Sequence, residues 1–201
     1  MITSISKELY KVQIKDFIGE VKMLPFSLEN LKEVPTQFKK LVKKMISALP
    51  DKKGVAYLTV DGKLVEKGKT QRRGGVHIDG NYLTSLEWGN GGGGGNGWKV
   101  GEGGRILSSK EHKLSYETET GGMLIASTYP ACKGWNGAFK GRPYVGGDCS
   151  RVKGLGEGFV LKPNIVYYGN SQFLHESLPI DKIIHRTLVR ITLPLDYPVL
   201  D

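Results

Sequence analysis

The feature that most constrains the fold is a series of short apolar runs after residue 55, separated by glycine, proline and asparagine. Short runs rich in Val, Ile, Leu and Tyr between turn residues are typical of β-strands. The expected strands are 55–58, 64–66, 75–79, 83–88, 105–107, 122–127, 158–161, 165–168 and 186–193. Asp61 and Gly62 fall between the first two, and Asp-Gly favours a tight hairpin turn. The pattern predicts a chain built mainly from antiparallel strands.

Helical periodicity is confined to the first fifty residues and is clearest in 35–48. Apolar residues there recur at the spacing of one helical face, with a proline at the start and another after the end. These residues are Phe38, Leu41, Val42, Met45 and Ile46. We therefore expect an α+β chain, mainly β. Its helical N-terminal part, about residues 1–50, would pack on a double-stranded β-helix (jelly-roll) core of about residues 55–195.

Length and composition agree with a single catalytic domain covering residues 1–201. The chain is 39% hydrophobic, enough to bury one substantial core. It contains no apolar stretch of membrane-spanning length and no apolar signal segment at its N-terminus, so we expect no membrane association and a cytoplasmic location. Cys132 and Cys149 are too few for a disulfide framework and lack zinc-site spacing, so we expect free thiols.

A candidate metal site lies in the segment GGVHIDG, residues 74–80. His77 and Asp79 are two residues apart, so in a strand they project from the same face and can hold one ion. His175 would supply a second imidazole. Two imidazoles and one carboxylate on one face of an octahedral ion leave other positions open, as in non-haem Fe(II) oxygenases. The alternative is a strand-edge histidine hydrogen-bonded to Asp79.

Two arginines follow His175 on the predicted strand 186–193. Arg186 comes eleven residues after this histidine and Arg190 fifteen, and the two share one face of the strand. The order His-X-Asp, distant His and then Arg resembles that of the 2-oxoglutarate- and Fe(II)-dependent dioxygenases. The resemblance covers about residues 73–193. The first fifty residues lie outside it.

The resemblance implies iron ligands, a co-substrate and an activity. The implied ligands of Fe(II) are His77, Asp79 and His175. Arg186 would pair with the far carboxylate of 2-oxoglutarate, and Arg190 is the second choice for that role. The implied reaction consumes O2 and 2-oxoglutarate, releases succinate and CO2, and hydroxylates a prime substrate.

Two other classes of protein remain open from the sequence. One is a cupin-like metalloprotein of other chemistry, although such proteins more often use three or four His or Glu ligands and would leave Arg186 without a role. The other is a basic, non-enzymatic nucleic-acid-binding protein on a jelly-roll scaffold. Fold analogy does not separate these classes, whereas iron-dependent succinate release does.

The prime substrate is not identified by the sequence. The formal charge of +9 favours an anionic one, with nucleic acid among the candidates. The lysines of segment 35–48 form either a solvated face or a guide for an anionic polymer. Trp135 and Arg142, in an insert at 129–155 that the resemblance does not cover, are candidates for substrate binding, although Trp135 would equally serve to anchor a long loop. The glycine-rich segment 89–97 lacks a following helix, so we expect a loop rather than a nucleotide site.

Overall fold

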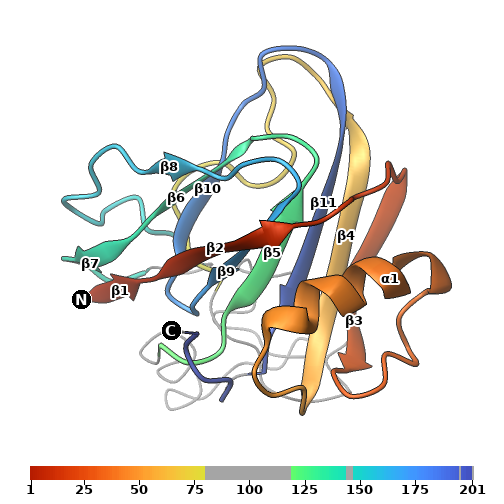
Figure 1. Cartoon of the computed structure of the whole chain (residues 1–201). Coiled ribbons are helices and arrows are strands. Elements are labelled where there is room, and N and C mark those ends of the chain that lie inside the picture. Colours follow the sequence, from red (N-terminus) through yellow and green to blue (C-terminus); the bar gives the residue numbers. More distant parts are fainter. Residues whose placement is uncertain (80–118, 144–146, 195, 201) are drawn as a thin grey trace, which may run out of the picture.

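The computed structural model describes residues 1–79, 119–143, 147–194 and 196–200 (Figure 1). Its elements are β1 (Ile2–Ser4), β2 (Ser6–Lys11), β3 (Gly19–Ser27), α1 (Thr36–Met45), the 3-10 turn η1 (Ile46–Ala48), β4 (Val55–Val65), β5 (Met123–Ser127), β6 (Cys132–Trp135), β7 (Gly137–Phe139), β8 (Phe159–Val160), β9 (Ile165–Gly169), β10 (Leu174–Ser177) and β11 (Ile184–Thr192). In this part of the chain the protein is mainly β, with one short α-helix.

A six-stranded antiparallel sheet forms the larger layer, in the order β2-β9-β5-β11-β4-β3. Strand β11 lies between β5 and β4, and its residue Arg190 is opposite Ile125 on one side and Thr59 on the other. Side chains alternate between the two faces of a strand. Val189 and Ile191 therefore enter the main hydrophobic core, whereas Arg190 points to the opposite face.

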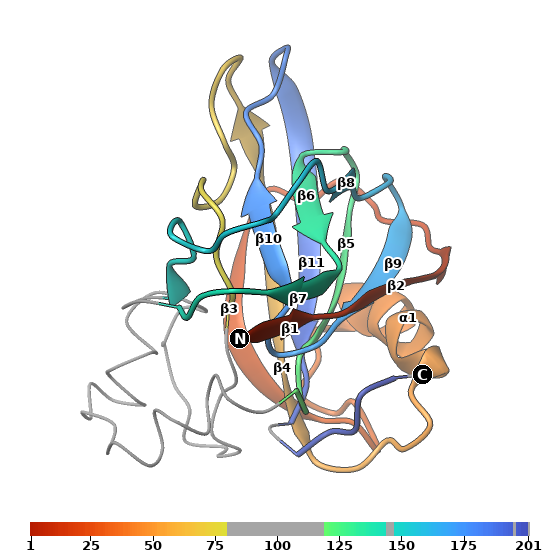
Figure 2. The same ribbon diagram turned by 90° about the vertical axis from the view of Figure 1, so that its left-hand side faces the viewer.

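A three-stranded sheet, β10-β6-β8, forms a second layer, and β1 pairs with β7 in a separate ribbon. Figure 2 shows β6 and β10 in front of β5 and β11. His77 extends the smaller sheet, because it forms isolated antiparallel bridges with His175 and with Asp148. The antiparallel sheets agree with the expected mainly β chain. They are not closed into a barrel in the described residues, so the jelly-roll topology stays a prediction.

Helix α1 packs on the large sheet, across β3 and β4 in Figure 1. Phe38, Val42 and Met45 are buried in the main core, as the periodicity of 35–48 predicted. None of the helices in the described residues is both long and apolar enough to cross a membrane.

The rest of the N-terminal part corrects the expectation of helices over residues 1–50. The segment from Ile2 to Ser27 forms β1, β2 and β3 instead of helices. Strand β2 pairs with β9, and β3 pairs with β4. Without β2 and β3, strands β9 and β4 would each present unpaired backbone N–H and C=O groups at a sheet edge. Pairing with β2 and β3 satisfies these groups.

The expected hairpin at Asp61 and Gly62 is also wrong, because β4 passes through both residues as one strand of 11 residues. A Cβ atom on Gly62 would lie 1.7 Å from the carbonyl oxygen of Phe17. Glycine is therefore required here because another backbone segment approaches closely, which is a common reason for glycine within a strand.

Several other expected strands can be compared directly. Strands β5, β8, β9 and β11 confirm the runs 122–127, 158–161, 165–168 and 186–193 to within a few residues at their ends. The run 75–79 contributes only the bridge at His77. The predicted strands 83–88 and 105–107 and the glycine-rich segment 89–97 lie outside the described residues.

Candidate metal centre

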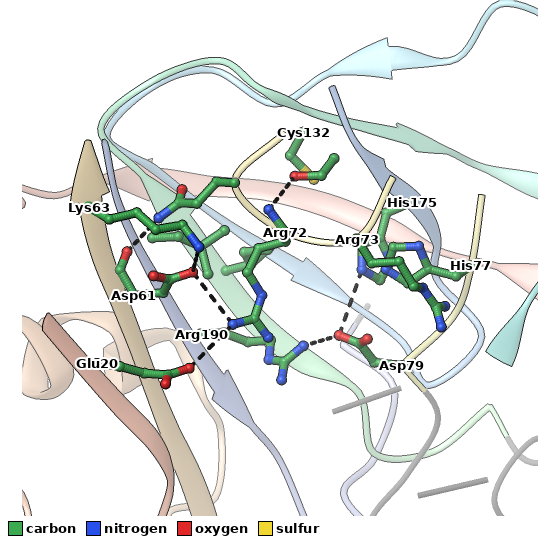
Figure 3. Close-up of a pocket in the computed structure, with 14 residues that line it drawn as sticks. Glu20, Asp61, Lys63, Arg72, Arg73, His77, Asp79, Cys132, His175 and Arg190 are labelled. Atoms are coloured by element: carbon green, nitrogen blue, oxygen red, sulfur yellow. Dashed lines mark hydrogen bonds and ion pairs between the residues drawn. The ribbon is translucent and has the colours of Figure 1, made fainter. Parts of the chain in front are cut away.

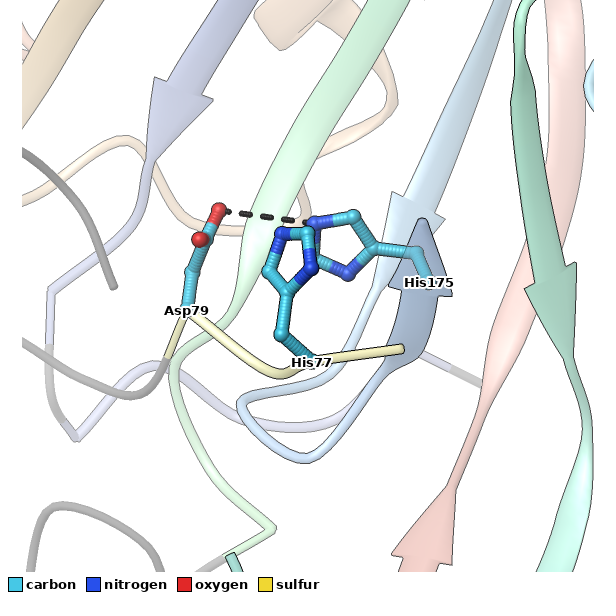
Figure 4. A group of neighbouring side chains, drawn as sticks. All are labelled: His77, Asp79 and His175. Atoms are coloured by element: carbon cyan, nitrogen blue, oxygen red, sulfur yellow. Dashed lines mark ion pairs between the residues drawn. The ribbon is translucent and has the colours of Figure 1, made fainter. Parts of the chain in front are cut away.

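His77, Asp79 and His175 converge on one point (Figure 4). One potential ligand atom from each residue lies within 4.8 Å of the others, and this is the only such group of His, Cys, Asp and Glu in the described residues. His175 lies on β10, and the other two belong to the segment that follows β4. The distant histidine and the His-X-Asp pair are therefore neighbours, as the sequence predicted.

The backbone explains why the two histidines point the same way. His77 N–H donates to the carbonyl oxygen of His175 at 2.9 Å, and His175 N–H donates back to that of His77 at 3.0 Å. Residues directly opposite in an antiparallel bridge carry their side chains on the same face. The imidazole rings accordingly lie 4.4 Å apart between centroids. Asp79, two residues after His77, projects to the same side (Figure 4).

Hydrogen bonds to the backbone fix the tautomer of both imidazoles. Nδ1 of His77 lies 2.7 Å from the carbonyl oxygen of Gly75, and Nδ1 of His175 lies 2.9 Å from that of Phe173. A carbonyl oxygen can only accept, so each Nδ1 carries the hydrogen and each Nε2 keeps its lone pair. Metal-ligating histidines are commonly oriented by such a bond from the second ring nitrogen. Nε2 of His175 lies 3.7 Å from Oδ2 of Asp79.

The protonation states also suit a metal ion. Burial, together with the nearby His175 and Arg73, lowers the pKa of His77 to about 3, and burial also lowers the pKa of His175. Burial alone would raise the pKa of Asp79, but the charge of Arg190 and the two histidines hold that pKa below its ordinary value. At neutral pH the centre therefore offers two neutral imidazoles and one carboxylate, the forms that bind metals.

A pocket of about 420 Å³ opens beside the three residues (Figure 3). Ile125, Leu188 and Arg190 line it from the large sheet, and Cys132, His175 and Ser177 line it from the smaller one. It therefore lies between the two layers. The remaining lining residues come from β3, β4 and the segment 71–79; they are Glu20, Asp61, Lys63, Gln71, Arg72, Arg73, His77 and Asp79.

The two arginines of β11 occupy different environments. Arg190 lines the pocket and forms an ion pair with Asp79. Arg186 is fully buried and is not among the lining residues. Its Nη1 donates to Oε1 of Gln71 at 2.8 Å and its Nη2 to Oγ of Ser127 at 3.3 Å. The second choice from the sequence is thus the arginine beside the centre, and the first choice lies behind the pocket wall.

The two candidate substrate residues of the insert lie away from this pocket. Trp135 is buried in a separate apolar cluster with Ile2 and Leu174, and its Nε1 donates to the carbonyl oxygen of Gly156 at 3.2 Å. Arg142 is exposed, and neither residue lines the pocket. These contacts match the loop-anchoring alternative for Trp135.

Cys132 and Cys149 are free thiols, as expected, and both are buried. Burial raises the pKa of each thiol to about 12. Both are therefore protonated at neutral pH, and the thiolate is the reactive form of cysteine. Cys132 contributes a neutral, weakly polar surface to the pocket.

The polar and charged residues at the end of the pocket away from the three candidate ligands were not predicted from the sequence. Asp61 was assigned to a turn, whereas β4 carries it into the pocket wall. Arg72 and Gln71 come directly before the His-X-Asp segment, and that proximity in sequence is the one pattern that pointed to them. Glu20 and Lys63 reach the pocket from adjacent strands, β3 and β4.

Fold and site together define a mainly antiparallel β protein with a candidate His-Asp-His metal centre between two sheet layers. Comparison of the chain with family models, curated proteins and solved structures gave no match.

Proposed function

We propose that this protein is an Fe(II)- and 2-oxoglutarate-dependent oxygenase that hydroxylates a prime substrate. The observation that carries the proposal is the convergence of His77, Asp79 and His175, with both Nε2 lone pairs left for a metal by backbone hydrogen bonds at Nδ1. Two nitrogen ligands and one carboxylate suit Fe(II) and leave positions for a chelating acid and O2.

The pocket supports binding of the co-substrate next to the centre. A 2-oxo acid bound at the metal would carry its second carboxylate into the pocket, where a guanidinium is the preferred partner. Arg190 is the arginine of β11 that lines the pocket. We therefore assign this role to Arg190, which lines the pocket beside Asp79, and a structural role to Arg186, which is fully buried outside the pocket lining and donates to Gln71 and Ser127.

Iron(II), 2-oxoglutarate and O2 together would supply oxidative decarboxylation to succinate and CO2, coupled to hydroxylation of a C–H bond. The chain supplies orientation and exclusion of water. Ile125 and Leu188 give the pocket apolar walls on the large sheet. Two neutral imidazoles and one carboxylate leave a divalent ion with a net charge of about +1, which favours an anionic co-substrate.

The geometry of the site in the described residues favours neither of the two alternative classes. A cupin-like centre would normally have a further His or Glu ligand, and no fourth residue of these types joins the group within the part of the chain that the structure describes. A nucleic-acid-binding scaffold would give no role to two buried, neutral histidines oriented towards a carboxylate.

The test is release of succinate from 2-oxoglutarate by the purified protein with Fe(II) in air. We expect turnover that is lost when the iron is chelated and that is absent in Asp79→Ala. His185→Ala is the matched control, because His185 lies on β11 near Asp16 and does not line the pocket. Succinate release that is equal in wild type and Asp79→Ala, or absent from the folded wild type, would overturn the proposal.

A further inference from the structure

The end of the pocket beyond the metal centre contains a carboxylate with unused hydrogen-bonding capacity (Figure 3). The side chain of Asp61 is 8% exposed, and the nearest cations are Nζ of Lys63 and Nη1 of Arg72, each 3.6 Å from its Oδ2. Both distances exceed that of a hydrogen bond. Within the described residues no side chain or backbone group donates a hydrogen bond to this carboxylate. A ligand with N–H donors could donate hydrogen bonds to the carboxylate oxygens of Asp61.

Arg72 offers the complementary charge in the same place. Its Nη1 lies 3.6 Å from Asp61 and 3.9 Å from Oε1 of Glu20, so its guanidinium makes ion pairs with these acids but no hydrogen bond within the described part of the chain. The side chain is 30% exposed. A planar guanidinium in this state can bind a carboxylate with two parallel hydrogen bonds.

Neighbouring residues hold the backbone at both positions. Asp61 lies within β4, opposite Leu188 of β11 and Glu20 of β3. Gln71 donates from Nε2 to the backbone oxygen of Asp61 at 2.7 Å and accepts from Arg186. The backbone of the residue after it, Arg72, is therefore tied to β4 and β11 through its neighbour. A fixed backbone lowers the conformational entropy that is lost when a ligand binds.

The charge balance of the pocket differs from that of the whole chain. The lining residues include four Lys or Arg cations and three carboxylates, so their formal net charge is +1 (4 − 3), whereas the chain carries +9. The cations are Lys63, Arg72, Arg73 and Arg190, and the carboxylates are Glu20, Asp61 and Asp79. Most of the excess positive charge thus lies outside the pocket. The pocket suits a ligand that carries both signs better than it suits a polyanion.

We propose that the prime substrate is a free α-amino acid. Its ammonium group binds Asp61, its carboxylate binds Arg72, and its side chain extends towards the metal centre. A volume of about 420 Å³ is in the range of small-molecule sites and leaves room for a short co-substrate as well. The assignment as a substrate rests on the proposed function, but the binding of the two charged groups does not.

Calorimetric titration of the metal-free protein with each of the twenty protein amino acids tests the binding. We expect at least one to bind, and we expect its N-acetyl and methyl ester derivatives to bind at least about tenfold more weakly, because each has lost one charge-assisted partner. Asp61→Asn and Arg72→Gln should each weaken binding of the free amino acid to a similar degree. Asp51→Asn is the matched control, since Asp51 is exposed, lies 3.9 Å from Nζ of Lys53 and does not line the pocket.

A second measurement separates this inference from the proposed function. The amino acid that binds should also raise the rate of succinate release above its rate without prime substrate. Basal succinate release without binding or stimulation by any amino acid, or stimulation by an oligonucleotide instead, overturns the inference and keeps the oxygenase. Binding that depends on Asp61 and Arg72 without any succinate release supports the zwitterion site and overturns the oxygenase. Binding unchanged in folded Asp61→Asn and Arg72→Gln overturns the inference.

Discussion

Two backbone carbonyl groups decide what the histidines of the candidate centre can do. Gly75 and Phe173 accept hydrogen bonds from Nδ1 of His77 and His175, so both Nε2 atoms are left to face Asp79. The His-X-Asp pair, together with a distant histidine followed by two arginines, predicted which three residues meet. It could not predict the tautomers, because these depend on carbonyl groups whose positions only the folded backbone sets.

Removal of any one ligand should nearly abolish metal binding. Loss of a residue that only hydrogen-bonds to a metal ligand lowers metal affinity about 10- to 100-fold, and loss of a direct ligand should lower it more. We expect His77→Ala and His175→Ala to lose at least about 100-fold in affinity for Mn(II), measured by titration under anaerobic conditions. His185→Ala should bind the ion as wild type does. Unchanged affinity in folded His175→Ala would exclude the assigned ligand set.

A second prediction at the scale of single residues concerns the two arginines of β11. Removal of the guanidinium that pairs with the co-substrate should cost about 2 kcal/mol, or roughly thirtyfold in the KM for 2-oxoglutarate. We expect Arg190→Gln to show this increase without losing metal affinity, because the lost charge repels a cation. Arg186→Gln should lower the free energy of unfolding and leave this KM nearly unchanged. The reverse pattern would return the role to Arg186.

Alternation along β11 could not decide between these arginines, since both lie on one face of the strand. The difference arises from Gln71, which is 115 residues away in sequence from Arg186 and engages its guanidinium. A contact of that separation leaves no pattern in a single sequence. The same holds for Asp61 and Arg72, which meet only in the folded chain.

Acidification should destabilise the metal-free protein through its buried histidines. The unfolded chain binds protons at these residues near pH 6.5, whereas the folded chain does not, since burial lowers the pKa of His77 to about 3 and that of His175 as well. Their contribution to stability is thus complete above pH 6.5 and is lost as the pH falls towards 3. Urea unfolding at pH 7.5 and pH 5 should show a smaller loss for His77→Gln than for wild type. An equal loss would contradict the assigned neutral state.

At the scale of elements, glycine explains why the hairpin predicted at Asp61 and Gly62 was wrong. The Asp61-Gly62 pair has the composition of a turn, but a strand that must admit another backbone segment has the same requirement for glycine. The helix at 35–48 was predicted well, because its apolar face has helical spacing and prolines mark its ends. The strands before it carry mixed polar and apolar residues and are defined by their partners, β9 and β4.

Gly62→Ala tests this account of β4. The added Cβ atom would meet a backbone oxygen at 1.7 Å, which no side-chain rotation can relieve. We expect a loss of about 3 kcal/mol in the free energy of unfolding, the upper part of the range for overpacked sites. Gly74→Ala is the control, because its Cβ would lie 3.7 Å from the nearest atom, an ordinary contact. Equal stability of the two variants would show that β4 does not pass Phe17 as described.

At the scale of the whole molecule, the site depends on two sheet layers. The sequence predicted a mainly antiparallel β chain, but not how the strands are ordered in these layers. The large sheet supplies Arg190 and the apolar wall, the smaller one supplies His175, and the segment after β4 brings His77 and Asp79 between them. Strand periodicity predicts which residues share a face, but it cannot predict which strands become neighbours. The long-range order β2-β9-β5-β11-β4-β3 therefore had to come from the structure.

The central claim is that the three residues hold a metal ion which 2-oxoglutarate also contacts. The most direct measurement is a crystal structure of the protein soaked anaerobically with Mn(II) and 2-oxoglutarate. We predict the ion on Nε2 of His77, Nε2 of His175 and the carboxylate of Asp79, with 2-oxoglutarate chelating it and its far carboxylate on Arg190. A centre that stays free of metal at saturating Mn(II), or an ion bound only elsewhere, would contradict the account.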